Sequence, residues 1–274
     1  MCRAAEWVRH FVHVITTFGG RTSARFGGRP MSLSQPFTLL MSKRVPPMTS
    51  LLLTAPVFLV YHLGLLFINY RNGVDWVTGF TLELVEWNEA AYVGLTVAVV
   101  CALALYCYVR DRQQPIPRPL FGRVLLESLA WAIVMMVSVG WAISYLSSSL
   151  SRSLAVGPIA NMGTTDKIVM AAGAGFHEEV VFRVLVLGGL WTYLKGRKMS
   201  PGASFGWACL VSALVFAGAH HLGSLSEPFT APVFAFRALA GTFLGLIYAV
   251  RGFAIAVYTH TLYDILIFFF PLFL

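Results

Sequence analysis

The chain has 274 residues, of which 57% are hydrophobic and only 12% are charged, whereas soluble domains carry roughly 25% charged residues. This composition excludes an ordinary soluble enzyme and indicates an integral membrane protein. The net charge of +8 does not indicate nucleic-acid binding, because the basic residues lie at the ends of apolar segments, where they act as topology signals.

Residues 1–48 are predicted to form a basic cytoplasmic tail ahead of a transmembrane domain over 49–274. In this tail, seven Arg and Lys residues stand against one acid. Arg9, His10 and His13 interrupt its apolar residues, so it lacks the apolar core of roughly 7 to 15 residues that a signal peptide needs. We therefore expect no cleaved export signal and a location in a bacterial inner membrane.

Seven segments approach the roughly 20 apolar residues that a membrane-spanning helix needs. We predict an all-α fold, a polytopic bundle of about seven transmembrane helices with the functional site enclosed between them. The predicted spans are 49–70, 90–109, 124–146, 166–194, 205–222, 233–250 and 253–274. The fourth exceeds one bilayer thickness. The sixth carries Gly241 and Gly245, a spacing of small residues that lets helices approach closely.

Between the first two spans lies an acidic stretch with a helical pattern of its own. Residues 77–87 place Phe80, Leu84 and Trp87 at helical spacing, which predicts a short helix lying in the membrane interface. The loops also differ in charge, since those on one side hold 15 basic residues and those on the other hold 3. By the positive-inside rule, the N-terminus is expected in the cytoplasm and the C-terminus outside.

The fourth span contains two adjacent acids and an arginine, Glu178, Glu179 and Arg183. A charge inside a membrane costs about 2.5 to 3.5 kcal/mol on insertion scales, so such residues are expected to face a cavity and to find partners. Glu179 and Arg183 are four residues apart and share a helix face, whereas Glu178 points to a neighbouring helix. We predict that Glu179 is paired with Arg183 and that Glu178 is free.

Two later spans carry polar pairs at the same spacing, Phe216 with His220 and His260 with Asp264. If the three helix faces converge, the site holds a free carboxylate, two imidazoles and a second carboxylate, Asp264, able to fix the orientation of His260. These groups are suited to activating water in a cavity shielded from bulk solvent. Two histidines with a carboxylate could also hold zinc, so the sequence leaves the cofactor open.

In these residues the chain resembles the CPBP (ABI) family of intramembrane proteases, which includes the type II CAAX prenyl proteases and bacteriocin-processing proteins. The family motifs are Glu-Glu-x-x-x-Arg, Phe-x-x-x-His and His-x-x-x-Asn/Asp, and here they read Glu178-Glu179-x-x-x-Arg183, Phe216-x-x-x-His220 and His260-x-x-x-Asp264. The resemblance covers about residues 165–270.

The resemblance implies an intramembrane endopeptidase that acts on a membrane-anchored protein or peptide within the lipid bilayer. By the same resemblance Glu178 activates water and His220 assists, while His260 and Asp264 stabilise the oxyanion or orient ligands. Glu179 and Arg183 serve either as a structural ion pair or in catalysis. The family does not decide between a metal such as zinc and a metal-free mechanism. Depths counted along the predicted helices place the site in the outer half of the membrane.

Two other functions are consistent with these residues. A non-catalytic member of the same fold, such as a bacteriocin-immunity protein or a scaffold, would bind peptides, although the intact motifs favour an enzyme. A proton-coupled transporter also uses buried acids and histidines, but it would predict broken helices and a repeat, and neither is visible in the sequence.

Four other polar residues receive structural interpretations. His177 lacks the second histidine that the zinc motif His-Glu-x-x-His requires, because Val181 occupies that position. His62 is interpreted as a hydrogen-bonded core residue, His221 as an interfacial residue, and Arg237 as a side chain that reaches up to the membrane interface.

Overall fold

The computed structural model describes residues 44–110, 117, 119–146, 162–222 and 226–270. In these ranges all regular secondary structure is helical, which confirms the predicted all-α class. The helices are α3 (Pro47–Gly64), α4 (Trp76–Leu84), α5 (Glu89–Arg110), α6 (Pro119–Leu146), α8 (Thr164–Gly173), η2 (Ala174–Gly188), α9 (Gly189–Gly196), α10 (Pro201–Ala219), α11 (Ala231–Arg251) and α12 (Phe253–Phe269). Most of the predicted tail, residues 1–43, lies outside the described residues.

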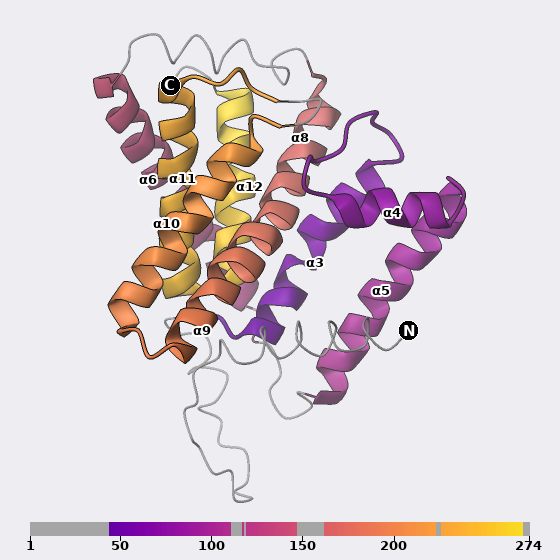
Figure 1. Ribbon diagram of the computed structural model, residues 1–274. Helices are drawn as coiled ribbons and strands as arrows, with labels where there is room; N and C mark the ends of the chain where they lie inside the picture. Colours follow the sequence, from indigo (N-terminus) through magenta and orange to yellow (C-terminus); the bar gives the residue numbers. More distant parts are fainter. Residues whose placement is uncertain (1–43, 111–116, 118, 147–161, 223–225, 271–274) are drawn as a thin grey trace, which may run out of the picture.

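Five of these helices, α3, α5, α6, α10 and α11, are long and apolar enough to cross a membrane. They correspond to five of the seven predicted spans. The predicted seventh span is the shorter apolar helix α12, of 17 residues. The predicted fourth span is a continuous helical run formed by α8, η2 and α9. The chain is therefore an integral membrane protein built as a helical bundle (Figure 1).

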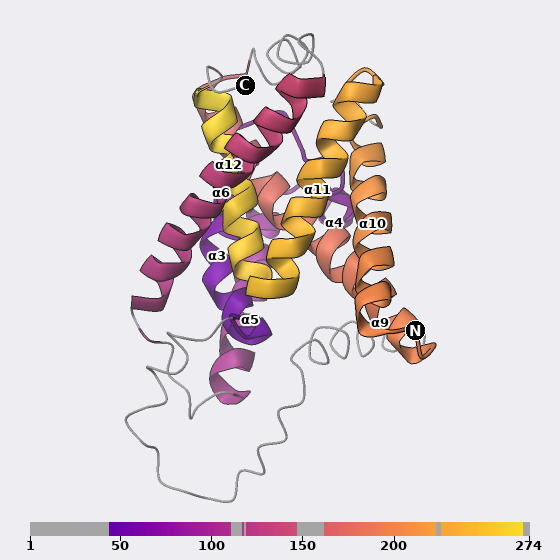
Figure 2. The ribbon, with the colours of Figure 1, turned by 90° about the vertical axis from the view of Figure 1, so that its left-hand side faces the viewer.

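Helix α12 lies in the middle of the bundle, next to α6 and α11 (Figure 2). Its first nine residues, 253–261, are all buried, and four consecutive apolar residues, 254–257, have no exposed surface. A helix that is apolar on every side is stable only when other elements surround it. This central position explains how a helix of 17 residues can contribute side chains to a site between the others.

The run formed by α8, η2 and α9 changes its winding in the middle. Residues 174–188 form a π-helix, which is wider than an α-helix and often occurs at functional sites. Here η2 packs directly on α12, because a Cβ atom on Gly175 would lie 1.9 Å from Thr261 Oγ1 and 2.9 Å from the Thr261 backbone nitrogen. The apolar pattern predicted a helix in this region but did not reveal its π winding.

The close approach predicted for Gly241 and Gly245 is confirmed. A Cβ atom on Gly241 would lie 3.1 Å from Ala213 Cα, and one on Gly245 would lie 3.1 Å from Cys209 Sγ. Both contacts are with α10, so the two glycines bring α11 against it. This packing places the C-terminal end of α10, where His220 follows, beside η2.

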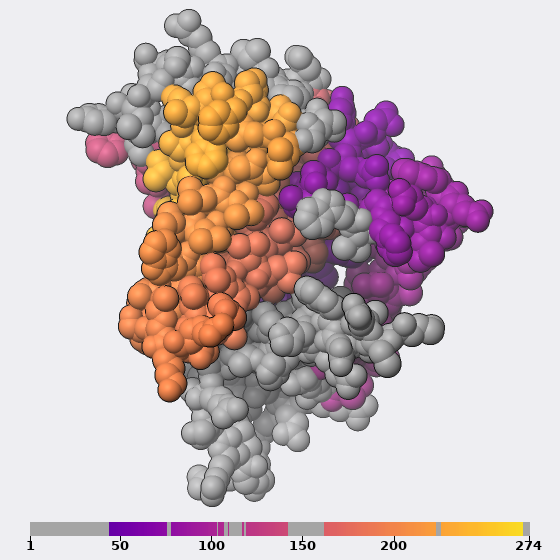
Figure 3. All heavy atoms as spheres, in the orientation of Figure 1, coloured from indigo at the N-terminus to yellow at the C-terminus, as the bar shows by residue number. Residues whose placement is uncertain are grey.

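The segment predicted as a helix over 77–87 contains α4, but this helix ends at Leu84, and Trp87 lies beyond it with a φ angle of 61°. The N-terminus of α4 is capped by Asp75, whose Oδ1 accepts a hydrogen bond of 3.0 Å from the Thr78 backbone nitrogen. Phe80 and Leu84 are each 68% exposed, as expected for a helix with an apolar outer face. The space-filling view shows α4 and α5 on one side, α10 and α11 on the other, and the surface of the α8 to η2 run between them (Figure 3).

Candidate active site

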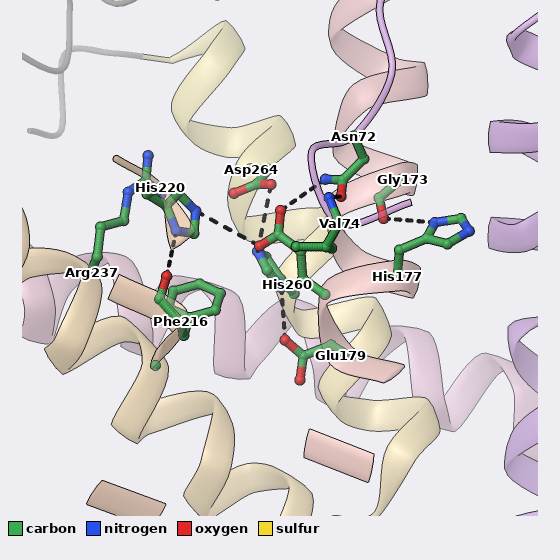
Figure 4. Close-up of polar contacts among 12 residues, drawn as sticks. Asn72, Val74, Gly173, His177, Glu179, Phe216, His220, Arg237, His260 and Asp264 are labelled. Carbon is green, nitrogen blue, oxygen red and sulfur yellow. Dashed lines mark hydrogen bonds and ion pairs between the residues drawn. The ribbon is translucent and has the colours of Figure 1, made fainter. Parts of the chain in front are cut away.

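All six predicted site residues lie together between η2, the end of α10 and α12. Figure 4 shows four of them, Glu179, His220, His260 and Asp264. Helix η2 carries Glu178, Glu179 and Arg183, the residue after α10 is His220, and α12 carries His260 and Asp264. Five of the six are buried, and the side chain of His220 is 17% exposed. The three helix faces therefore meet, which the sequence had left as a condition.

Glu178 presents its two carboxylate oxygens to different partners. Oε1 accepts a hydrogen bond of 2.8 Å from the side-chain amide of Asn72. Oε2 is buried without a hydrogen-bond partner among the described residues. It lies 3.7 Å from His220 Nε2 and 3.9 Å from His260 Nε2, which is too far for a direct hydrogen bond but within reach of a bridging molecule.

Each oxygen of Glu179 lies close to a partner, and its side chain is completely buried, although the contact of Oε2 with Arg183 is an ion pair without hydrogen-bond geometry. Its Oε2 pairs with Arg183 Nε at 3.1 Å, which agrees with the predicted ion pair. Its Oε1 lies 2.8 Å from His260 Nδ1. The guanidinium of Arg183 also stacks 4.5 Å from the centre of the Phe216 ring. The buried carboxylate therefore has a cation and an imidazole as partners, as a charge in a low-dielectric interior requires.

The expected pairing of His260 with Asp264 is different in the structure. Asp264 Oδ2 is 3.7 Å from His260 Nε2, beyond hydrogen-bond distance, and Nδ1 is held by Glu179. The ring orientation of His260 is thus set by a carboxylate on η2 and not by its neighbour on α12. Because a carboxylate only accepts, Nδ1 donates to Glu179 and Nε2 points toward Glu178.

His220 is oriented by its own helix. Its Nδ1 lies 2.8 Å from the carbonyl oxygen of Phe216, and a carbonyl only accepts, so Nδ1 carries the proton. The neutral ring then presents the lone pair of Nε2 toward Glu178. The Phe216 ring is 1% exposed and packs 4.6 Å from the His220 ring and 6.0 Å from the His260 ring, measured between ring centres. Phe216 therefore acts as the packing residue of its motif.

The lone histidines have structural partners. His62 Nδ1 is 2.6 Å from the hydroxyl of Tyr92, which agrees with its interpretation as a hydrogen-bonded core residue. His177 Nδ1 is 3.2 Å from the Gly173 carbonyl oxygen, and its Nε2 is 3.4 Å from Asp75 Oδ1. Neither ring reaches the carboxylate of Glu178 with a hydrogen bond in the described residues.

Arg237, interpreted from the sequence as a side chain that reaches the membrane interface, pairs with an acid in the segment between α10 and α11. Its Nε lies 3.1 Å from Glu227 Oε2, and its Nη2 contacts the other oxygen of the same carboxylate. Although burial opposes the charge, Arg237 holds the pKa of Glu227 below its ordinary value. Glu227 also binds the segment after α10, since its backbone nitrogen donates to the His220 carbonyl at 2.9 Å. The sequence interpretation did not include this ion pair.

Two contributors to the site region were not predicted, Asn72 and Glu227. Asn72 lies in the loop between α3 and α4, 106 residues before Glu178. The only sequence signal there is the Asn72-Gly73 dipeptide, which indicates a turn and nothing about a distant contact. The described residues contain no group of three or more His, Cys, Asp or Glu side chains placed to hold a metal ion.

The comparison with protein families identifies the part of the chain that carries this site. Residues 161–266 match the family model described as Type II CAAX prenyl endopeptidase Rce1-like. Comparisons with curated proteins and with solved structures found no match. The matched segment contains all six predicted site residues, and α3 to α6 lie before it. Residues 161–266 of this integral membrane protein are therefore similar to the Rce1-like family of type II CAAX prenyl endopeptidases, in agreement with the resemblance of their three motifs.

Proposed function

We propose that this protein is an intramembrane endopeptidase that hydrolyses a peptide bond of a membrane-associated substrate, using water activated by Glu178. The observation that carries the proposal is the geometry around Glu178 Oε2. This buried oxygen has no hydrogen-bond partner among the described residues and faces the Nε2 atoms of His220 and His260 at 3.7 and 3.9 Å. A water molecule placed among these three atoms would be held for proton transfer.

The hydrogen bonds of the two histidines suggest different roles in the reaction. His220 is a donor at Nδ1, so its Nε2 can accept a hydrogen bond from one O–H of the water while Glu178 removes the proton of the other. His260 is bound by the carboxylate of Glu179, which stabilises a positive imidazolium. In that state Nε2 can donate to the oxygen of the scissile carbonyl as negative charge develops there.

The chemical steps then balance without a further reactant. Glu178 removes a proton from water as the water oxygen attacks the carbonyl carbon, and a tetrahedral intermediate with one negative oxygen forms. The C–N bond breaks, and the proton taken by Glu178 passes to the leaving nitrogen. The products are a carboxylic acid and an amine, and the site residues return to their starting states. General acid-base catalysis of this kind contributes typically about 10²- to 10⁴-fold to the rate.

The substrate is proposed to be a protein or peptide held in the membrane, because the site is built from helices of a membrane bundle. The family description supports a CAAX-type bond as one candidate, and C-terminal sorting segments and peptide precursors are others. We further propose a bacterial inner membrane as the location. A cytoplasmic N-terminus is proposed from the charge distribution of the loops, and a site that opens on the outer side from the depths of its residues along the helices.

The proposal is tested by comparing membrane proteomes of a deletion strain complemented with the wild type, with Glu178→Gln or with Glu127→Gln. Glu127 is a matched control because it is a partly buried carboxylate on α6 that pairs with Arg251, outside the site. Uncleaved precursors should accumulate with the deletion and with Glu178→Gln only. The purified wild type should then cleave such a precursor. Tight binding of the precursor without cleavage by the wild type would favour the non-catalytic alternative.

A further inference from the structure

We propose that Asn72 is a positioning residue for Glu178, which rests on the proposed function of Glu178 as the base. Asn72 lies in the loop between α3 and α4, outside the segment that matches the family. Its Nδ2 donates a hydrogen bond of 2.8 Å to Glu178 Oε1. Both side chains are buried, at 7% and 8% exposure, so water does not readily replace this contact.

The contact selects one orientation of the carboxylate. With Oε1 held by an amide donor, the other oxygen, Oε2, is directed toward His220 and His260. A hydrogen bond to a charged acceptor is stronger than one between neutral groups. Asn72 thus keeps the reactive oxygen aimed at the histidines without touching the reacting atoms.

Asn72 is itself fixed by three further hydrogen bonds, unlike a loop residue whose side chain is free to move. Its backbone nitrogen donates to the Tyr61 hydroxyl at 3.0 Å, and its Oδ1 accepts from the Val74 nitrogen at 3.0 Å. Its carbonyl oxygen accepts from the Asp75 nitrogen at 3.1 Å. Every polar group of the residue is therefore satisfied in one conformation, as expected of a group that must hold another one in place.

The partners of Asn72 are anchored in turn. Tyr61 has no exposed surface and donates to Asp75 Oδ2 at 2.8 Å. Its ring fills the space beside Gly173, where a Cβ atom would lie 2.4 Å from Tyr61 Cε2. Asp75 also caps α4 and lies 3.4 Å from His177 Nε2 on η2. The loop is thus fastened to α3, α4 and η2 together, which gives a fixed reference for the Glu178 carboxylate.

The variant that isolates the donor is Asn72→Asp. It has the same shape and retains the acceptor for the Val74 nitrogen and the backbone bonds to Tyr61 and Asp75. It replaces the N–H donor by an oxygen that repels the Glu178 carboxylate. We expect kcat to fall about 10- to 100-fold, with KM within about twofold of the wild type, because Asn72 acts through Glu178 and not on the substrate.

The matched control is Asn88→Asp. Asn88 also accepts a backbone hydrogen bond at its Oδ1, from the Ala91 nitrogen at 3.0 Å near the start of α5, but it is exposed and does not contact the site. The same chemical change there should leave kcat and KM unchanged. Thermal unfolding and size-exclusion profiles in detergent show which variants fold. If Asn72→Asp is unfolded, the kcat of Asn72→Ala, which removes the donor without adding charge, tests the role of the donor instead.

The pH dependence separates positioning from a merely structural role. At low pH the carboxyl introduced by Asn72→Asp gains a proton and can again donate to Glu178, as in a pair of carboxylates that share one proton. The ratio of variant to wild-type kcat should therefore rise as the pH falls. Wild type and variant share every other ionisable group near Glu178, so a change of the ratio with pH reports the introduced carboxyl. The shared groups are Asp75, His177, Glu179, Arg183, His220, His260 and Asp264.

A wild-type kcat in folded Asn72→Asp, or in folded Asn72→Ala where the aspartate variant is unfolded, would overturn the inference. A loss with a ratio that does not change with pH would also overturn it, as would an effect on KM alone. These results are distinguishable from failure of the proposed function. In that case the wild type would not cleave the precursor, or Glu178→Gln would cleave it at the wild-type rate.

Discussion

Glu178 and Glu179 are adjacent in the sequence but have different surroundings. Glu179 is fully buried and bound to Arg183 and His260 through its two oxygens. Glu178 is bound at one oxygen by a neutral amide, and its other oxygen faces two histidines without a hydrogen bond. The same side chain is thus suited to holding the site together at one position and to accepting a proton at the next.

Glu178→Gln should lose activity and keep the fold. Glutamine preserves the shape but cannot act as a base, so the rate of cleavage should fall by about 10²- to 10⁴-fold. Removing a buried charge that has no cationic partner in hydrogen-bond contact also removes a desolvation cost. Turnover by the purified variant, alongside its thermal unfolding, measures both effects. Wild-type turnover in a folded Glu178→Gln protein would contradict the assignment of the base.

His260→Ala and Asp264→Asn should differ in severity. His260→Ala removes the group proposed to stabilise the oxyanion, and loss of one such donor costs about 10²- to 10³-fold in kcat. Asp264→Asn should be milder, because His260 is oriented by Glu179 at 2.8 Å and Asp264 Oδ2 lies 3.7 Å from the ring. Steady-state kinetics of both purified variants tests this order. An Asp264→Asn protein as inactive as His260→Ala would show that the charge of Asp264 is required.

Glu179→Gln should destabilise the protein as well as inactivate it. Arg183 and Glu179 have no exposed side-chain surface, and removing one partner of a buried ion pair costs roughly 3–5 kcal/mol because the other charge is left uncompensated. Denaturant or thermal unfolding in detergent measures the loss. Glu127→Gln, which breaks a more exposed ion pair with Arg251, should be less destabilising. Equal stability of Glu179→Gln and the wild type would rule out a structural role for this pair.

At the scale of helices, the site depends on how closely η2 lies against α12. Glu178 and Glu179 are on one helix and His260 is on the other, so the 2.8 Å contact between Glu179 and His260 sets the spacing. Gly175 permits this approach, since it has no side chain to meet the backbone of Thr261. The π winding and Gly175 therefore occur at the same contact between η2 and α12.

Gly175→Ala should separate these two helices. Its Cβ would lie 1.9 Å from Thr261 Oγ1 and 2.9 Å from the backbone nitrogen, so the helices must shift at a cost of about 1–3 kcal/mol. Activity should fall at the same time, because His260 moves away from Glu179. Gly189→Ala, in the same helical run with open space around it, is the matched control and should be neutral or slightly stabilising. Full activity of Gly175→Ala would contradict the packing argument.

At the scale of the whole molecule, the orientation in the membrane decides where the substrate is found. The segment after α10 and the turn before α10 lie at opposite ends of this helix. In the proposed orientation the turn near Arg197 is cytoplasmic and the segment with Leu222 is outside. The site lies at the His220 end of α10, so it is predicted to be closer to the outer surface.

Cysteine labelling tests this orientation in a protein whose native cysteines have been replaced. Leu222 is 74% exposed, so the cysteine of Leu222→Cys should react with a membrane-impermeant maleimide added to intact spheroplasts. Arg197→Cys, also at an exposed position, should react only after lysis. The reverse labelling pattern would show that the bundle has the opposite orientation in the membrane. The site would then be closer to the cytoplasmic side, and the substrate would be sought there.

The sequence by itself determined those features that depend on neighbours along the chain. Apolar segments of sufficient length predicted a membrane bundle, and spacings of four residues predicted which polar side chains share a helix face. The ion pair of Glu179 with Arg183 follows from the same spacing. Such features are readable because the rise and turn of a helix are fixed by backbone hydrogen bonding.

Only the tertiary structure decided which groups meet across the bundle. Asn72 reaches Glu178 from 106 residues away, and Glu179 instead of Asp264 holds the ring of His260 from 81 residues away. The depth and rotation of each helix determine these contacts, and they depend on close packing at positions such as Gly175. A loop residue such as Asn72 has no periodic pattern, so its partner is defined only when the helices have packed.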